Sequence, residues 1–313
     1  MLSRRTVILA KVETNYGTDA TPGTGNGIAC TIPDLTPTGD ILTRDFVRNS
    51  ISPFGHAIGA KVVELSFDTE LKGSGSNTSS AAVLPEIDPL LRICGMTPTF
   101  TSSGTNSWTA TYKPVSTNFN SATIYVYRDG ILHKITGCRG TFSLNLEAGN
   151  YGKISWTIRG LYQDPIDQSM ISGVQYNTTV PPIVKNVQLT LDSYSPYVRA
   201  ITFDLGNTLA ERRDVNAAEA LREITITSRT SQGTIDPEMD LLSVFNWYQK
   251  WSSASDILLQ ATQIGTTNGN KIQFKCPKIK LRDLRYDDRD GVLVLRAGFQ
   301  AVGEDDEVQL VFM

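Results

Sequence analysis

Apolar and polar residues alternate along several short stretches of the chain, and this pattern limits the fold more than any other feature of the sequence. The alternation runs through residues 61–68, 122–127, 131–135, 141–146 and 153–159. Side chains of a β-strand point to opposite faces in turn, so strict alternation predicts half-buried strands. Asp129-Gly130 separates two of these stretches and is typical of a tight hairpin turn, because such a turn needs positive φ at both central residues. Gly149 to Gly152 predicts a second turn. We therefore expect a four-stranded antiparallel meander over residues 122–160.

A short helix is expected just before this meander. Leu84, Ile87, Leu91 and Cys94 follow one another at spacings of three, four and three, which places them on one face of a helix. Prolines lie near its start and Gly95 follows its end. The pattern predicts one amphipathic helix that packs on the sheet.

The second half of the chain repeats the same order of elements. A strand at 222–228 is followed by a helix that Asp236-Pro237 opens, with Leu241, Val244, Phe245 and Tyr248 on one face. Strands then follow at 256–261, 271–275, 278–284 and 292–298, with the last turn over residues 286–291. Further strands are expected at 187–191 and 200–204, and long loops at about 38–60 and 205–221. This repeated order favours a tandem duplication over a single elaborated domain, which stays open as the alternative.

The fold class that follows is mainly β, with two tandem units that each combine an antiparallel sheet with a short flanking α-helix. We expect residues 28–168 to form the first unit, 169–182 a linker and 183–313 the second unit. Residues 1–27 are expected to form an N-terminal arm that becomes ordered only on assembly, against another subunit.

Composition excludes several classes of protein. Of the 313 residues, 40% are hydrophobic and 19% are charged, which fits a folded chain. The 32 acidic groups against 29 basic ones argue against a sequence-reading nucleic-acid binder, which needs a concentrated basic face. Four dispersed cysteines are too few for a disulfide scaffold and predict small buried residues in a reducing compartment. The apolar run after Arg4-Arg5 stops at Lys11, too early for a signal peptide, and no stretch is long enough for a membrane helix.

Residues that could carry chemistry are scarce. His56 and His133 are the only histidines, neither at metal-ligand spacing, and no nucleophile, phosphate-loop or dinucleotide motif is present. Asp287, Asp288 and Asp290 before Gly291 lack the spacing of a calcium loop and favour a hairpin turn. We expect no enzyme activity, cofactor or metal. The acidic run Glu304 to Glu307 predicts either a solvated loop or the lead into a C-terminal strand over 308–312 that pairs with a neighbouring subunit.

Several segments resemble the tail tube (major tail) proteins of bacteriophages with long, non-contractile tails. The matching segments are residues 11–20, 122–142, 146–153, 204–207 and 216–220. The resemblance implies β-sandwich tube domains, assembled into stacked rings whose inward-facing strands form one β-barrel around a channel for the genome. Two units in one chain imply trimeric rings with pseudo-sixfold symmetry, with hexameric rings as the alternative.

The same resemblance implies the partners and the place of action. The protein would bind further copies of itself, enclose the tape measure protein and genomic DNA, and meet tail terminator and tail tip proteins at its ends, with no membrane partner. It would be made in the host bacterial cytoplasm and act in the virion tail. An acidic or neutral lumen would let DNA slide. The long segments 38–60 and 205–221 are candidates for ring-to-ring contact, and Arg212, Arg213 and Asp214 could pair there or stay solvated.

Other functions fit the sequence less well. A different phage structural component, such as a tail terminator, connector or capsid-associated protein, would form rings that do not stack. A carbohydrate-binding β-sandwich module would need an exposed aromatic platform built from Trp108, Trp156, Trp247 and Trp251. Trp156 alternates with Ile154 and Ile158, which favours a core or interface position instead.

Overall fold

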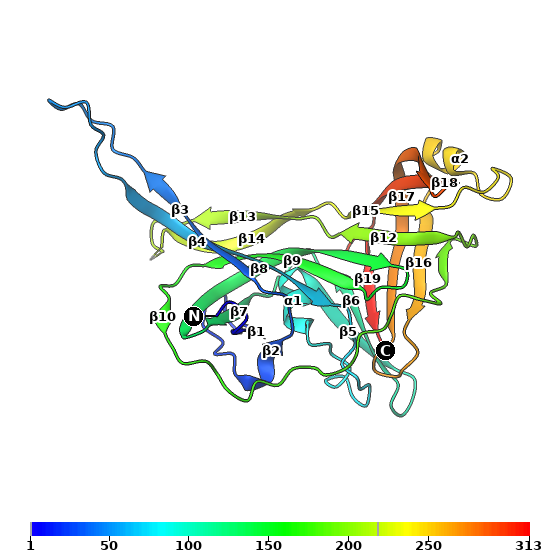
Figure 1. Cartoon of the computed structure of the whole chain (residues 1–313), viewed down its shortest axis with the longest axis horizontal. Helices are drawn as coiled ribbons and strands as arrows, with labels where there is room; N and C mark the ends of the chain where they lie inside the picture. The colour runs from blue at the N-terminus through cyan, green and yellow to red at the C-terminus, as the bar shows by residue number, and fades with distance from the viewer. Residues whose placement is uncertain (1, 218) are drawn as a thin grey trace.

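The computed structural model describes residues 2–217 and 219–313, and its architecture is mainly β (Figure 1). The first half contains β1 (Thr6–Val12), β2 (Gly27–Ile28), β3 (Asp34–Leu42), β4 (Ala57–Glu70), α1 (Asp88–Ile93), β5 (Met96–Ser102), β6 (Trp108–Pro114), β7 (Ala122–Arg128), β8 (Ile131–Glu147), β9 (Lys153–Leu161) and β10 (Ile166–Asp167), with one 3-10 turn at Thr24–Asn26. The second half contains β11 (Leu189–Leu191), β12 (Val198–Asp204), β13 (Asn207–Arg213), β14 (Leu221–Arg229), β15 (Gln232–Pro237), α2 (Trp247–Ser252), β16 (Ile257–Ile264), β17 (Ile272–Arg289), β18 (Val292–Ala301) and β19 (Gln309–Phe312).

Antiparallel pairing connects the strands of each half in one order. In the first half the order is β1-β7-β8-β9-β4-β3. In the second half it is β11-β16-β17-β18-β15-β12. The two halves are joined because β12 pairs with the C-terminal end of β8, from Ala200 opposite Glu147 to Asp204 opposite Ser143. A mainly β fold with large antiparallel sheets is thus confirmed.

The predicted meander has three strands rather than four. The stretches 131–135 and 141–146 belong to one strand, β8, whose register with β9 shifts between Thr136 and Arg139. Before this bulge β8 pairs with β7, and after it β8 pairs with β9 and β12. Likewise 271–275 and 278–284 fall in β17, which is 18 residues long. A bulge bends a strand from one layer into the next, so an interruption of the alternation does not have to end the strand.

The turns and helices were predicted with mixed success. Asp129 and Gly130 form the two-residue turn between β7 and β8, both at positive φ, as expected. The last turn is shorter than predicted: only Asp290 and Gly291 connect β17 to β18, since residues 286–289 belong to β17. The first helix is confirmed as α1, which buries Leu90, Leu91 and Ile93.

The start of the second helix was predicted wrongly. Asp236 and Pro237 end β15, and the Asp236 carboxylate accepts hydrogen bonds from the Ala200 and Arg199 backbone N–H groups at 2.7 and 3.1 Å. The helix begins only at Trp247, where the Asn246 side chain accepts a bond from Gln249 N at 2.9 Å and caps it. Leu241 and Val244 are 76% and 59% exposed, so their helical spacing does not mark a buried face.

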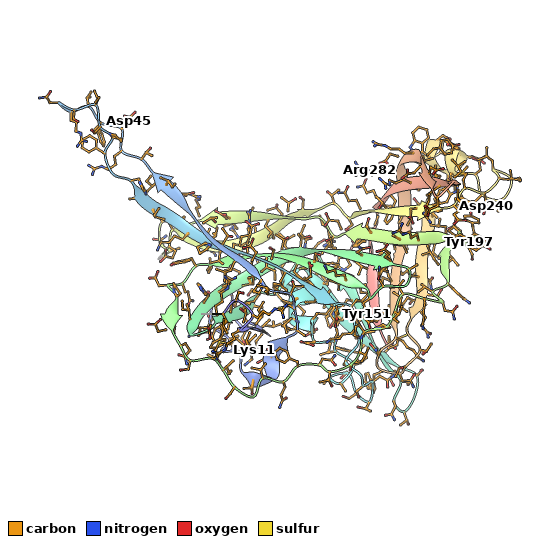
Figure 2. The ribbon with its side chains drawn as sticks, in the orientation of Figure 1. Lys11, Asp45, Tyr151, Tyr197, Asp240 and Arg282 are labelled. Carbon is orange, nitrogen blue, oxygen red and sulfur yellow. The ribbon has the colours of Figure 1, made fainter. Side chains whose placement is uncertain are left out.

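The predicted long loops are β-hairpins. Residues 38–60 belong to the hairpin β3–β4, which projects far from the body of the molecule and carries Asp45 at its tip (Figures 1 and 2). Residues 205–221 include all of β13 and reach the first residue of β14, and these two strands make a separate two-stranded sheet. β-branched and apolar residues on both arms allow each segment to pair with itself.

The described residues of the N-terminal segment have partners within their own chain. All seven residues of β1 pair with β7, and Ile8, Leu9 and Ala10 are buried. The buried Glu13 carboxylate then accepts hydrogen bonds from Ser121 Oγ at 2.6 Å, from Thr123 Oγ1 at 2.8 Å and from two backbone N–H groups. The described part of the predicted arm is therefore ordered within its own chain, because a strand edge and a buried carboxylate both have partners there. Met1 of that arm lies outside the described residues.

The core fills the space between the layers and contains three of the four cysteines, whose burial was predicted. Trp156 is 1% exposed, and its indole N–H donates to Thr69 Oγ1 at 2.9 Å, so the core position expected for it is confirmed. Cys94, Cys138 and Cys276 are buried free thiols, and burial raises the pKa of each. Cys30 is half-buried, and burial together with the charge of Glu86 raises its pKa to about 12.

Gly206, at the bend where β12 becomes β13, has a backbone that other residues rarely adopt. Its φ is +67°, and a Cβ there would lie 2.2 Å from the Thr230 carbonyl oxygen. We expect Gly206→Ala to lower the free energy of unfolding by about 2–4 kcal/mol, since it combines backbone strain with a clash. Urea unfolding of the monomer measures this.

Gly149→Ala is the matched control, because Gly149 also has positive φ, +83°, but open space at its Cβ. It should cost only about 1 kcal/mol from the backbone term. Equal losses in the two variants would show that the close approach at Gly206 does not matter.

Candidate assembly interface

One continuous sheet crosses both halves of the chain. Its eight strands follow the order β3-β4-β9-β8-β12-β15-β18-β17. One face of this sheet packs on the core through side chains such as Trp156 and Phe203. The other face, here called the polar face, is open to solvent except where the hairpin β13–β14 covers Val62, Leu161 and Arg139. It carries hydroxyl and amide side chains at Ser143, Asn145, Ser155, Thr157, Thr202 and Thr234.

Ion pairs on the polar face cross between neighbouring strands. Lys153 of β9 lies 2.6 Å from Asp68 of β4, and Arg159 lies 3.4 Å from Glu64. Desolvation raises the pKa of Asp68, but the hydrogen bonds from Lys153 and Ser155 and the charge of Lys153 lower it by more, so the net pKa is below its usual value. Asp68 therefore stays charged at neutral pH. The face is polar and of mixed sign, without a concentrated basic patch.

The hairpin β13–β14 of the second half lies against the first half. Leu221 and Ile224 pack with Val62, and Leu161 and Leu209 flank them. Polar bonds fix the same contact: Arg139 Nη1 donates to the Ile224 carbonyl oxygen at 2.6 Å, and Ile224 N donates to Tyr16 Oη at 2.7 Å. Burial raises the pKa of Tyr16, so its hydroxyl stays neutral. The halves are therefore joined by both a ladder and a packed hairpin.

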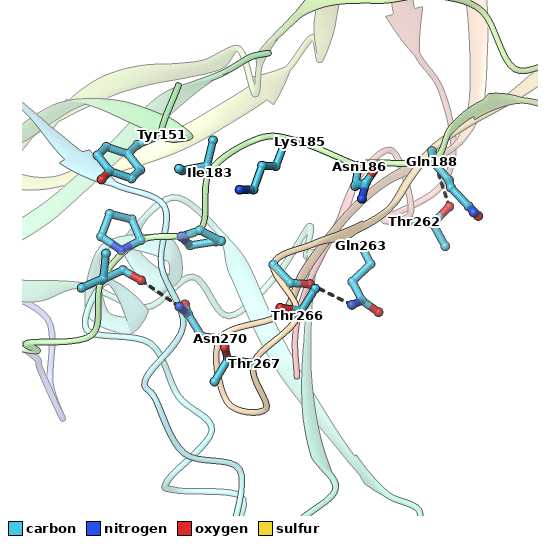
Figure 3. Close-up of a pocket in the computed structure, with 14 residues that line it drawn as sticks. Tyr151, Ile183, Lys185, Asn186, Gln188, Thr262, Gln263, Thr266, Thr267 and Asn270 are labelled. Atoms are coloured by element: carbon cyan, nitrogen blue, oxygen red, sulfur yellow. Dashed lines mark hydrogen bonds between the residues drawn. The ribbon is translucent and has the colours of Figure 1, made fainter. Parts of the chain in front are cut away.

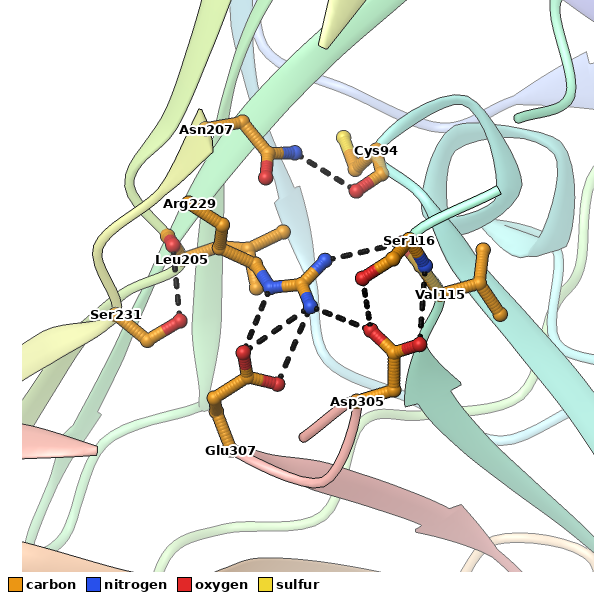
Figure 4. A network of polar contacts seen from close by, with 9 residues as sticks. All are labelled: Cys94, Val115, Ser116, Leu205, Asn207, Arg229, Ser231, Asp305 and Glu307. Atoms are coloured by element: carbon orange, nitrogen blue, oxygen red, sulfur yellow. Dashed lines mark hydrogen bonds and ion pairs between the residues drawn. The ribbon is translucent and has the colours of Figure 1, made fainter. Parts of the chain in front are cut away.

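Arg229 is the central polar group of this joint (Figure 4). Its side chain is 9% exposed and pairs with Glu307 at 3.1 Å and Asp305 at 3.0 Å, while Nη1 donates to the Val115 carbonyl oxygen at 3.2 Å. Asp305 also accepts from Ser116 Oγ at 2.6 Å. Arg229 thus connects the second-half hairpin, the C-terminal segment and the first half.

The acidic run and the last strand have partners inside the chain. Asp305 and Glu307 pair with Arg229, and Asp306 lies 2.8 Å from Lys113. The strand that follows, β19, pairs with β17 on one side and with β6 on the other. The predicted C-terminal strand is confirmed as β19, but its partners are strands of its own chain and not of a neighbouring subunit. The acidic run before it is not simply solvated, because the chain itself supplies the cations.

A groove of about 560 Å³ lies where the connecting segment runs past the β16–β17 turn (Figure 3). Asn270 holds the two together: its side-chain amide donates to the Val180 carbonyl oxygen and accepts from Gly73 N, each at 2.8 Å. Tyr151, two prolines, amides and hydroxyls line it, and Lys185 is its one charged side chain.

The three predicted contact residues lie at the end of the β13–β14 hairpin. Arg212 pairs with Glu223 across the hairpin, and Arg213 pairs with Asp40 of the other hairpin at 2.5 Å. The hydrogen bond from Arg213 lowers the pKa of Asp40. Asp214 accepts from Asn216 N at 2.9 Å, a turn contact that lowers its pKa. The structure brings Arg212 and Arg213 to one exposed end, and their role between rings stays a prediction.

Two sheet edges are open at opposite ends of the eight-stranded sheet. At one end, β3 pairs with β4 alone among the strands of the described chain. At the other, the stretch 283–289 of β17 pairs with β18 alone across the same residues. Exposed apolar side chains lie near both edges, including Ile41, Leu42 and Ile58 on the hairpin β3–β4 and Tyr286 and Leu293 on the hairpin β17–β18.

In the part of the chain that the structure describes, no group of three His, Cys, Asp or Glu side chains could hold a metal ion. His133 lies in β8, where burial and the charge of Arg128 lower its pKa. No helix over residues 2–217 and 219–313 is long and apolar enough to cross a membrane. Of the four tryptophans only Trp251 is markedly exposed, so they form no aromatic platform.

Comparison with known protein families gives one match, and it spans nearly the whole chain. The model of the phage tail tube protein family matches residues 3–310. The chain belongs to the phage tail tube protein family. A comparison with the curated proteins found no match. This tail tube protein is therefore a structural, non-enzymatic component of the virion tail that polymerises into the tail tube.

Sequence reasoning missed part of the machinery of this tail tube protein. The hairpin β5–β6 escaped notice, although alternation over 97–101 and 108–112 could have signalled it. Nothing in the sequence linked Arg229 to Glu307, which are 78 residues apart. The resemblance at 216–220 includes Ala218, which lies outside the described residues.

Arg229 gives a sharp test of the joint. Arg229→Met should lower the free energy of unfolding by about 3–5 kcal/mol, because it leaves Glu307, 13% exposed, as an uncompensated charge. The double variant Arg229→Met/Glu307→Gln should recover a large part of this loss. Chemical unfolding of the monomer measures both.

Arg199→Met is the control, since Arg199 forms its pair with Glu147 at the solvent-exposed surface. It should leave the unfolding midpoint nearly unchanged. A similar midpoint for the Arg199 and Arg229 variants would contradict the role given to burial.

Proposed function

We propose that this tail tube protein carries two tandem tube units, at 28–168 and 183–313 with 169–182 between them, and that three chains close one ring. The observation that supports this best is the repeated pairing order, β1-β7-β8-β9-β4-β3 in one half and β11-β16-β17-β18-β15-β12 in the other, in which β1 of the N-terminal segment completes the sheet of the first unit from outside the bounds 28–168. All ten of these pairings are antiparallel. Six strands meeting twice in one order is a strong argument for duplication, since sheets of this size allow many other orders.

Residue registers support the same proposal. Ile41 pairs with Ile58 in the first hairpin, and Leu209 pairs with Ile226 in the second. Subtracting 41 from 209 and 58 from 226 gives 168 in both cases. The same offset converts Gly39 opposite Lys61 into Asn207 opposite Arg229, and each hairpin carries a register shift just before the pair Ile41–Ile58 or Leu209–Ile226. Bulges are retained within families, so a shared position favours common descent of the two units.

Strand number favours three chains over six. The eight-stranded sheet of one chain gives 24 strands for three chains. With strands about 4.8 Å apart and tilted by about 40°, a closed ring of that number has a backbone diameter of about 48 Å. Six chains would double this diameter. A ring of three therefore gives a channel wide enough for a duplex without a large empty space around it.

We infer that the polar face lines the channel and that genomic DNA and the tape measure protein occupy it. By register, this face carries acidic side chains at Asp34, Glu64, Asp68, Glu70, Glu147, Asp204, Asp236, Asp283 and Asp287, and basic ones at Arg139, Lys153, Arg159, Lys280, Arg285, Arg289 and Arg296. Acidic groups outnumber basic ones, so phosphate is repelled more than it is bound. The hydroxyl groups that lie between the charged side chains are neutral, so they form no ion pairs with the phosphates of DNA.

Ring-to-ring contact is assigned in this proposal to the hairpin tip over residues 43–56, with Arg212, Arg213 and Asp214 beside it. Phe46 is 66% exposed and Ile51 is fully exposed, which is unusual for side chains of this size. Arg48 lies over the Phe54 ring at 4.4 Å, so side chains of the tip contact one another. Tail terminator and tail tip proteins would cover these contacts at the two ends of the tube.

Purified protein at high concentration should form hollow tubes of uniform width. Averaged cross-sections from electron cryomicroscopy should show three chains per turn of the ring, with six similar lobes. Rings of six chains would overturn the three-chain ring, and lobes that differ in outline within each chain would overturn the duplication.

Shortening the hairpin tip should separate ring formation from stacking. A variant that replaces residues 44–55 by Asn-Gly keeps the last pair, Leu42 opposite Ala57, and removes the exposed tip. We expect single rings and no tubes by electron microscopy. The control shortens the exposed β5–β6 loop over 103–107 and should still give tubes. Normal tubes from the tip variant would contradict a stacking role.

A further inference from the structure

The two halves of the chain are joined by a contact that forms once within each copy. Within each chain β12 pairs with the end of β8, and the hairpin β13–β14 extends from β12 over the first half. In the duplicated arrangement, β3 corresponds to β12 together with β13. β4 corresponds to β14 together with β15. The stretch 283–289 of β17 corresponds to the end of β8. These two counterparts are the open edges at the two ends of the eight-stranded sheet.

The correspondence between β8 and β17 can be followed residue by residue. Ala122 pairs with Cys138 at the start of β7, and Ile257 pairs with Ile279 at the start of β16. After the extra residue at the β17 bulge, Thr141 opposite Thr157 matches Asp283 opposite Gly298. Ser143 therefore corresponds to Arg285, and Leu144 corresponds to Tyr286. With the hairpin offset of 168, Phe203 corresponds to Leu35 and Asp204 to Thr36.

We infer that successive copies in the ring are joined by β3 of one copy pairing antiparallel with the stretch 283–289 of the next, in the register of the internal joint. Phe203 opposite Leu144 and Asp204 opposite Ser143 then become Leu35 opposite Tyr286 and Thr36 opposite Arg285. The contact is heterologous, so repeating it with a rotation of one third of a turn closes a ring of three chains. This inference rests on the proposed ring of tandem units and states which residues close it.

Exposure of apolar residues supports this occupant. Leu144, opposite Phe203 of β12, is 2% exposed within the core, whereas its counterpart Tyr286 is 59% exposed. Ile226 is 8% exposed in the docked hairpin, whereas its counterpart Ile58 is 51% exposed and its neighbour Ile41 is 64% exposed. The residues that the internal joint buries have apolar counterparts that remain uncovered in a single chain. A second copy of this chain is the partner whose shape matches them.

Prolines make the joint between copies weaker than the internal one. Leu205 N donates to the Phe142 carbonyl oxygen at 3.0 Å, and its counterpart Pro37 has no N–H to repeat that bond. Pro33 likewise lacks the donor of its counterpart Ile201. Proline on an open edge discourages random pairing with other strands. The edge is therefore suited to a partner that adds side-chain burial to a short ladder.

Cysteine pairing tests the register directly. Thr36→Cys/Arg285→Cys is made in the full chain, tubes are assembled, and a short bismaleimide or an oxidant is added. We expect a ladder of covalent dimers and trimers on a denaturing gel, ending at three chains. A mixture of the two single variants should stop at dimers, because a cysteine pair then forms only where a Thr36→Cys chain meets an Arg285→Cys chain, and no chain carries both introduced cysteines.

The control variant is Thr36→Cys/Thr101→Cys. Thr101 lies on β5, whose outer edge is also open, since β5 pairs with β6 alone in the described chain. This variant and the natural chain, whose four cysteines are buried or half-buried, should give no ladder. A ladder from the β5 variant would assign the joint to the wrong edge and overturn the inference.

The outcomes separate this inference from the proposed ring. Tubes with three-chain rings but no link between residues 36 and 285 would overturn the joint and leave the ring standing. A ladder that runs to six chains would support the joint and overturn the three-chain ring. Failure of the natural chain to form any ring would overturn both.

A second pair of variants tests the apolar part of the joint. Ile41→Asp should raise the critical concentration for assembly about tenfold or more, since it removes an apolar side chain that assembly buries, while the monomer melts as before. Its counterpart Leu209→Asp should destabilise the monomer instead, because Leu209 already packs within the chain. Unchanged assembly of Ile41→Asp would contradict the packing part of the inference.

Discussion

An antiparallel strand at the edge of a sheet exposes a row of unpaired N–H and C=O groups, and the whole organisation of this chain depends on where those edges find partners. Within the chain, β12 closes the edge of β8, and β19 lies between β6 and β17. These pairings turn two halves into one body. The open edges that remain, on β3 and on the end of β17, lie where a copy of the same chain can complete them.

Side chains decide which of the available pairings is stable. The ladder between β12 and β8 is only five residue pairs long, so it needs the apolar contacts of Leu221 and Ile224 and the buried charge of Arg229 beside it. A buried arginine with two carboxylates is costly to break because each partner would be left desolvated. The internal joint is thus more stable than its strand length suggests. On the matching outer edge at β3, Pro33 and Pro37 lack the backbone N–H groups that their counterparts have.

Membership of the tail tube family and the absence of a catalytic constellation in the described residues point to the same kind of work. The protein acts through shape: one face of a long sheet is packed, the other is polar and lightly acidic, and the ends remain open for the next copy. In the proposed ring the polar face lines the channel, and its hydroxyls and paired charges offer the phosphates of DNA no concentrated basic site. Function here is a property of surfaces and edges rather than of a pocket.

The sequence by itself determined the β-class, most strand positions, the Asp129-Gly130 turn, α1 and the family, because alternation and turn chemistry are local signals. It could not determine that β8 and β17 each run through a bend, since a bulge interrupts alternation without ending a strand. Leu241 and Val244 have helical spacing in a segment that stays exposed, so spacing alone misplaced the start of α2. Only the tertiary structure decided that β1 and β19 pair within the chain and that Arg229 meets Glu307, because strand partners and buried ion pairs depend on residues far apart in sequence that folding brings together.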